Sequence, residues 1–165
     1  MALSVRALVQ LTAEQTTALD LTTVSAPLSL ARQLTYTDGA GAGQADLIWS
    51  DTRTVSSSAT DTLDLAGSLT GALGNTLTFA RIKGLVVAAR PTNTTTLQVA
   101  RPESNGVPLL SAQASIPVPP GGLFVWLDRS AAGVAVTADT ADRIDIVNGS
   151  GASATYDIVI IGAAS

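Results

Sequence analysis

The 165-residue chain contains no cysteine and no histidine, and Lys83 is its only lysine. These absences exclude zinc sites of the usual ligand types, thiol nucleophiles, disulfides and imidazole acid–base relays. The many serines and threonines have no histidine to act as their base, and the Gly-x-Ser-x-Gly motif does not occur. We therefore predict a protein that is not an enzyme and that binds no cofactor.

Charge is also scarce, at 13% of residues against roughly 25% in an average soluble domain. The formal net charge is −4, and the few arginines are scattered, which argues against nucleic acid as a partner. Ser, Thr, Ala and Gly stand where a monomer of this size carries charged surface residues. We expect part of the surface to be covered by protein, in a homo-oligomer or a larger assembly.

Neither a secretion signal nor a membrane span is indicated. The apolar stretch Met1–Gln10 is interrupted by Arg6, and the charge-free segment Ser104–Leu127 contains four prolines that would break a spanning helix. We expect synthesis in the cytoplasm and no membrane partner.

Short segments with the pattern of β-strands recur along the chain. Some alternate apolar and polar residues, which is typical of half-buried strands, and others are continuous apolar runs, which predict central strands covered on both faces. The alternating segments are Leu28–Tyr36, Leu97–Val99 and Arg143–Val147, and the continuous runs are Gly122–Leu127 and Ile158–Ile161. Asn148-Gly149 between two strand signals predicts a hairpin, and Ala66–Gly74 could hold one helical turn.

The glycine-rich segment 38–44 predicts a flexible loop. It separates residues 1–37, expected to form an N-terminal arm or edge strands, from a body at 45–165, within one domain overall. The fold class predicted is all-β: an antiparallel β-sandwich or jelly roll with an extended N-terminal arm. A small closed barrel is the alternative.

Two groups of acidic residues are candidate sites. Asp139, Asp142 and Asp145 are spaced as a weak calcium candidate, but Asp142 and Asp145 would point to opposite faces of a strand, so solvated turn residues are the favoured interpretation. Asp61 and Asp64 could be imagined as glycosidase carboxylates, but few aromatic residues are available to hold a sugar. We therefore name no metal ligand and no catalytic residue.

Several segments share a pattern with one known class of proteins. They are Gln44–Thr54 (QADLIWSDTRT), Asp61–Thr70 (DTLDLAGSLT), Thr76–Lys83 (TLTFARIK), Pro120-Gly-Gly, Asp142–Ser150 (DRIDIVNGS) and Tyr156–Gly162 (YDIVIIG). In these segments the chain resembles small virion proteins encoded in the structural gene clusters of tailed bacteriophages. The resemblance extends from about Leu28 to Ser165 and is carried by structural rather than catalytic motifs. It implies a non-enzymatic β-sandwich located in the virion.

The resemblance implies a protein that decorates the capsid or sits in the tail. A compact single domain without coiled-coil heptads favours the first, a capsid decoration or cement protein that stabilises the head through protein–protein contacts. Its expected partners are further copies of itself, a trimer being one arrangement compatible with a capsid lattice, and virion proteins such as the major capsid protein. The alternative is a tail or tail-fibre component that recognises a host receptor or glycan, with Tyr36 and Trp49 as candidate interaction residues.

Overall fold

The computed structural model describes residues 2–165, and within this range every regular element is a β-strand. All strand pairs are antiparallel. The predicted all-β class is therefore confirmed. Within the described residues, no helix exists that is long and apolar enough to cross a membrane.

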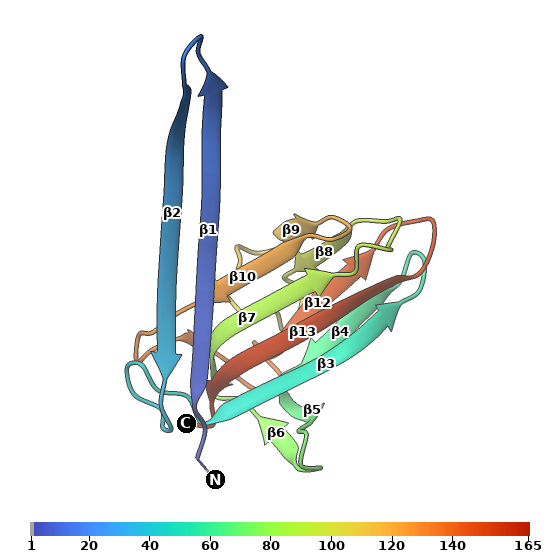
Figure 1. Ribbon diagram of the computed structural model, residues 1–165. Coiled ribbons are helices and arrows are strands. Elements are labelled where there is room, and N and C mark those ends of the chain that lie inside the picture. Colours follow the sequence, from blue (N-terminus) through green and yellow to red (C-terminus); the bar gives the residue numbers. More distant parts are fainter. Residues whose placement is uncertain (1) are drawn as a thin grey trace.

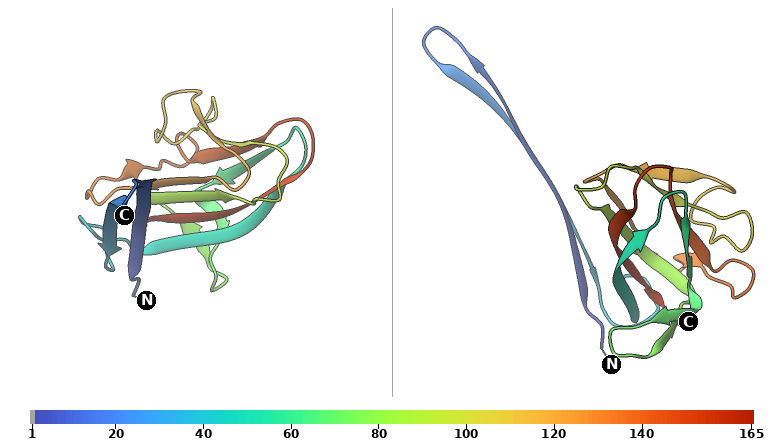
Figure 2. Two further views of the ribbon diagram at one scale, coloured as in Figure 1. Left: turned by 45° about the horizontal axis from the view of Figure 1, so that its top comes forward. Right: turned by 90° about the vertical axis from the view of Figure 1, so that its right-hand side faces the viewer.

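The N-terminal strands β1 (Val5–Ala18) and β2 (Thr23–Tyr36) form a two-stranded sheet of their own. This β1–β2 hairpin does not add edge strands to the other sheets, which was one of the two expectations for residues 1–37. It projects from one end of the body and leans away from it toward its tip (Figures 1 and 2). Leu28–Tyr36 is a strand as predicted, but the side chains of Leu28 and Leu30 are 55% and 44% exposed and are not covered by another sheet.

The remaining strands form two larger sheets and one small one. The first large sheet has the order β10-β7-β13-β3, with β11 also paired to β7, and is called the five-stranded sheet; the second has the order β4-β12-β8-β9. In chain order the strands are β3 (Leu47–Val55), β4 (Thr60–Asp64), β5 (Ala66–Thr70), β6 (Thr76–Thr78), β7 (Arg81–Ala89), β8 (Leu97–Ala100), β9 (Ser115–Val118), β10 (Leu123–Leu127), β11 (Val134–Ala135), β12 (Arg143–Asn148) and β13 (Ala154–Ala163), with β5 and β6 forming the small sheet.

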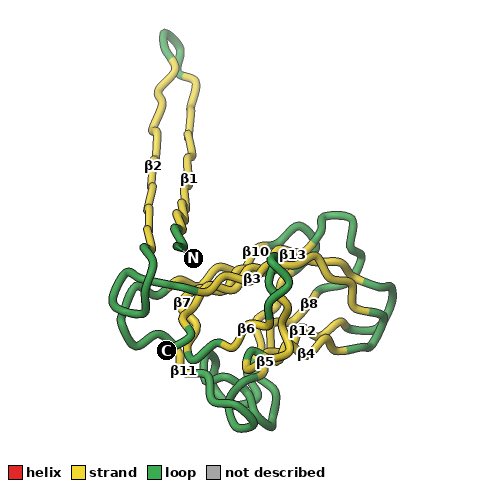
Figure 3. The backbone as a smooth tube through the Cα atoms, turned by 90° about the horizontal axis from the view of Figure 1, so that it is seen from below, coloured by secondary structure: helices red, strands yellow, loops and turns green. Residues whose placement is uncertain are grey.

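The main core draws its side chains from both larger sheets. Leu85 and Ile160 come from the five-stranded sheet, and Val99 and Ile146 from the other sheet, and all four are almost fully buried. Figure 3 shows β10, β13 and β3 on one side of the body and β8, β12 and β4 on the other. Period-two alternation places these residues on the inner faces of their strands.

Three local predictions are wrong. Gly122–Leu127 is not a central strand, because β10 lies at the edge of its sheet and Leu123 is exposed. Asn148-Gly149 does not close a hairpin, because β12 and β13 belong to different sheets; the buried Asn148 amide instead donates to the Val55 and Ala152 carbonyls. Ala66–Gly74 holds strand β5 and a turn rather than a helical turn.

β13 is the central element of the five-stranded sheet and carries a register shift between Ile161 and Gly162 where it pairs with β7. A Cβ atom at Gly162 would collide with the Arg81 carbonyl oxygen and lie 2.6 Å from the Phe79 ring. Only glycine therefore allows the backbones of β13 and β7 to approach this closely at the bulge.

We expect Gly162→Ala to lower the free energy of unfolding by about 1–3 kcal/mol, because the added methyl group overpacks the bulge. Gly149→Ala is the matched control, since a Cβ at Gly149 meets no atom within 4 Å. Urea unfolding measures both variants. Equal stability of the two would contradict the steric explanation.

Candidate functional site

The β1–β2 hairpin has one apolar face and one largely polar face. Side chains alternate between the faces of a strand, and residues directly opposite in the register share a face. The register therefore collects one set of residues, here called the apolar face: Val9, Leu11, Ala13, Val24, Ala26, Leu28 and Leu30. The other face carries mainly polar side chains, with Leu8 as its large apolar exception.

The apolar face is not covered along most of its length. Its five large side chains are between 44% and 55% exposed. Arg32, opposite Val9, is the charged residue that shares this face. The hairpin therefore presents a narrow hydrophobic ribbon to solvent.

Where the hairpin meets the body, this same side of it is buried. Tyr36, Leu34 and Val5 belong to a small cluster with Ile161 and Leu127 of the five-stranded sheet. The Tyr36 hydroxyl lies 3.2 Å from the Lys83 carbonyl oxygen and 3.1 Å from that of Asp128. Burial raises the pKa of Tyr36, which keeps the hydroxyl protonated as a donor. We call this contact the hairpin root.

Lys83 ties the glycine-rich loop to the root. Its side chain is fully buried, and the ammonium donates to the carbonyl oxygens of Ala40, Gly41 and Gln44 at 2.8, 2.6 and 2.9 Å. Burial lowers the pKa of Lys83 from its usual value. The buried ammonium of Lys83 therefore holds loop 38–44 against the body through three hydrogen bonds. The glycine content of this loop had predicted a flexible segment.

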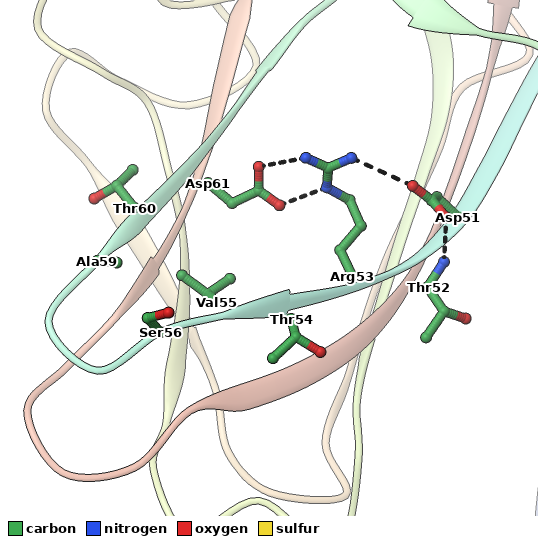
Figure 4. Close-up of a pocket in the computed structure, with 9 residues that line it drawn as sticks. All are labelled: Asp51, Thr52, Arg53, Thr54, Val55, Ser56, Ala59, Thr60 and Asp61. Carbon is green, nitrogen blue, oxygen red and sulfur yellow. Dashed lines mark hydrogen bonds and ion pairs between the residues drawn. The ribbon is translucent and has the colours of Figure 1, made fainter.

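A second polar cluster lies beside an open depression of about 440 Å³ at the ends of β3 and β4 (Figure 4). Arg53 holds Asp61 with two hydrogen bonds, from Nε at 2.5 Å and from Nη2 at 2.8 Å. The Tyr156 hydroxyl donates to the same carboxylate at 2.8 Å, and Arg53 also reaches Asp51 at 3.3 Å. The cluster links β3 and β13 to β4 of the other large sheet.

Hydrogen bonding and burial shift the pKa values of Asp61, Arg53 and Tyr156 in this cluster. The hydrogen bonds from Arg53 lower the pKa of Asp61, and the Tyr156 hydroxyl adds to this effect. Burial raises the pKa of Tyr156, and the bond to Asp61 raises that of Arg53. At neutral pH the carboxylate is ionised and the phenol is neutral, so this arrangement favours cross-sheet bonding over proton transfer. Asp64 instead accepts a hydrogen bond from the Ala66 amide.

The calcium candidates do not converge. Asp142 is buried and accepts a hydrogen bond from the Asp139 amide at 2.6 Å, while Asp145 accepts one from the Thr62 hydroxyl. Among residues 2–165, no group of three or more acidic side chains is arranged to hold a metal ion. The buried Asp142 Oδ1 has no hydrogen-bond partner in the described part of the chain and lies 3.9 Å from Arg143 Nε.

The two candidate interaction residues lie inside the body. Trp49 is 5% exposed in the main core, and Tyr36 is 1% exposed in the hairpin root. Neither side chain is therefore available on this chain as a surface anchor for a receptor or a glycan. Sequence reasoning missed Lys83, whose one signal was a lone lysine inside an apolar strand pattern.

Comparison of the chain with models of protein families, with curated proteins and with solved structures finds no match in any of the three. The interpretation of the site therefore depends on its geometry.

We expect Lys83→Met to lower the free energy of unfolding by about 1–3 kcal/mol, because three loop carbonyls lose their buried donor. Amide exchange should accelerate at Ala45, whose N–H is bonded to the Thr37 carbonyl across the loop. Arg81→Met is the control, since Arg81 lies on the same strand and its side chain donates to a single carbonyl, that of Ala131. Unchanged stability and exchange in Lys83→Met would show that the ammonium does not fasten the loop.

The carboxylate of Asp61 makes the stability of the protein depend on pH. Because its pKa is lower in the folded than in the unfolded state, its contribution to stability is complete above the unfolded pKa, near 3.8, and is lost as pH falls through the folded pKa. We expect Asp61→Asn to be less stable than the parent protein at pH 7 by about 1–3 kcal/mol, with a smaller difference at pH 3.

Asp51→Asn is the control for this titration, because Asp51 is an exposed partner of the same arginine. Urea unfolding from pH 3 to pH 7 measures all three proteins. A difference between Asp61→Asn and the parent protein that does not change with pH would argue against the lowered pKa.

Proposed function

We propose that this chain is a non-enzymatic structural protein of a tailed-bacteriophage particle, and that it attaches to the capsid as a decoration protein. The observation that carries the proposal is the β1–β2 hairpin, which stands away from the body with its apolar face in solvent. In this proposal the hairpin is an N-terminal arm, and the body is a β-sandwich of the jelly-roll kind.

Energetics support an assembly role for the hairpin. An isolated two-stranded hairpin is marginally stable in water. Covering a large aliphatic side chain that is half exposed contributes about 1 kcal/mol, so covering the five on this face contributes several kcal/mol. A neighbouring protein in the particle would supply that cover, and the low charge of the chain suits extensive protein–protein contact.

The head is favoured over the tail for two reasons. A single compact domain whose sequence has no coiled-coil heptads and no fibre-like repeat suits a decoration role. The tail alternative depended on Tyr36 and Trp49 as binding anchors, and both are buried. We propose further copies of the chain and the major capsid protein as partners, with synthesis in the host bacterial cytoplasm.

The test is binding of the purified protein to empty phage heads that lack it, followed by sedimentation and by antibody labelling in electron microscopy. We expect saturable binding and label on the heads. Leu28→Asp should weaken binding at least tenfold, because it places a charge in the apolar face. The matched control is the neighbouring Ser29→Asp, which lies on the opposite face and should bind like the parent protein. Label confined to tails, or no binding to heads, would reject decoration.

A further inference from the structure

We propose that the apolar face of the hairpin docks on the outer face of the five-stranded sheet in a second copy of this chain. The inference rests on the proposed assembly function and names the surface and the partner that it uses. Four observations support it: a matching apolar surface, an existing contact of the same kind, the length of the hairpin and the distribution of charge.

The receiving surface is the side of the five-stranded sheet that faces away from the main core. Val125, Val86 and Val159 lie side by side in the register of β10, β7 and β13. Leu123 on β10 and Ile48 on β3 lie on the same side of the sheet, two residues away from this row in opposite directions along the strands, and they are 64% and 41% exposed. We call these five residues the outer face. On the same side β3 contributes the polar residues Ser50 and Thr52, so the apolar part of this surface lies mainly on β10, β7 and β13.

The hairpin root already shows the contact that we infer. There, Leu34 and Val5 from the apolar side of the hairpin pack in one cluster with Leu127 and Val159 of the five-stranded sheet. Val159 also belongs to the outer face, and Leu127 follows Val125 on the same side of β10. The outer face therefore continues a surface that binds this side of the hairpin within one chain.

The five-stranded sheet of the same chain cannot cover the whole hairpin, because the hairpin is longer than that sheet and diverges from it. Strands of 14 residues span roughly 45 Å, whereas the ten residues of β13, the longest strand of the five-stranded sheet, span about 33 Å. Above the root the hairpin diverges from the body (Figure 2). The bonds from Tyr36 and Lys83 hold its base in that direction. A second copy can offer its outer face to the free length without breaking the root.

Charge also favours a contact between copies through the hairpin. Residues 5–36 contain two arginines, Arg6 and Arg32, and two acids, Glu14 and Asp20, so the hairpin is neutral and the rest of the chain carries the net charge of −4. Two bodies would repel each other, whereas a neutral hairpin approaches a body without that cost.

A complementary charge borders the receiving surface. Asp157 lies next to Val159 on the same side of β13, and its Oδ1 accepts bonds from Thr52 and Arg90. Within the described residues, its Oδ2 accepts no hydrogen bond. Arg32, the charge on the apolar side of the hairpin, has the chemistry to bind that free oxygen.

The size of the contact fits a stable complex only if it is reciprocal. The apolar face contributes five large side chains and the outer face three that are clearly exposed. A standard interface uses about 20–30 residues a side. Exchange of hairpins, in which each copy gives one and receives one, brings the contact closer to this size, because each copy then contributes both its hairpin and its outer face.

The experiment uses the absence of native cysteine. Leu30→Cys places a thiol on the apolar face, Val125→Cys places one on the outer face, and Ser29→Cys is the control on the opposite face of the hairpin. The full-length single variants are mixed in pairs and oxidised, and the disulfide-linked products are identified by mass spectrometry. We expect Leu30→Cys to cross-link to Val125→Cys at least ten times faster than Ser29→Cys does.

Each other outcome overturns the inference. An intramolecular disulfide in the double variant Leu30→Cys, Val125→Cys would show that the hairpin closes on its own sheet. Leu30→Cys homodimers as the main product would show that hairpins pair with one another. A monomer in sedimentation with no cross-link would exclude the contact. Binding of the reduced variants to empty heads distinguishes this inference from the proposed function. If the variants bind heads but form no mixed disulfide, the decoration function stands and the contact between copies is rejected. If the mixed disulfide forms but the variants do not bind heads, only the contact between copies stands.

Discussion

The structure depends most on the hairpin root, where a buried lysine and a buried tyrosine join three segments that are far apart in the sequence. The Lys83 ammonium binds three carbonyls of loop 38–44, and the Tyr36 hydroxyl binds the carbonyls of Lys83 and Asp128. A buried cation is costly unless its hydrogen bonds are satisfied, and here three carbonyl acceptors satisfy them. This contact sets the direction of a hairpin that has few other contacts with the body.

The five-stranded sheet has apolar side chains on both of its sides, and this accounts for part of the hydrophobic content of the sequence. Its inner side meets the other large sheet through Leu85 and Ile160, and its outer side exposes Leu123 and Val125. The 46% of hydrophobic residues therefore includes a set that does not stabilise the core. The Arg53–Asp61–Tyr156 cluster fixes the two sheets together at one end of the body.

Strand positions could be predicted from the sequence better than strand neighbours. Period-two alternation located β8 and β12, and a continuous apolar run located β13. The same kind of run in β10 predicted a central strand, which is wrong because β10 lies at the edge of its sheet. The pattern of residues shows that both faces of a strand are apolar, but it does not show whether another element covers each face. The pairing of Arg53 with Asp61 and Tyr156 was not predictable, since Tyr156 is distant in sequence and meets Asp61 only through sheet packing. Lys83 was missed because its acceptors are backbone atoms, which no side-chain motif reports.

The order of the strands has a consequence for how the chain folds during synthesis. β1 and β2 are neighbours in sequence, so the hairpin can form locally on a timescale of about 1–10 μs. The five-stranded sheet pairs β3 with β13, so it cannot be completed until residues 154–163 have been made. At ribosomal rates of roughly 5–20 residues per second, that delay lasts several seconds. Residues 5–36 are thus made long before the domain that orients them, and the apolar side chains of this segment are uncovered on the nascent chain throughout that interval.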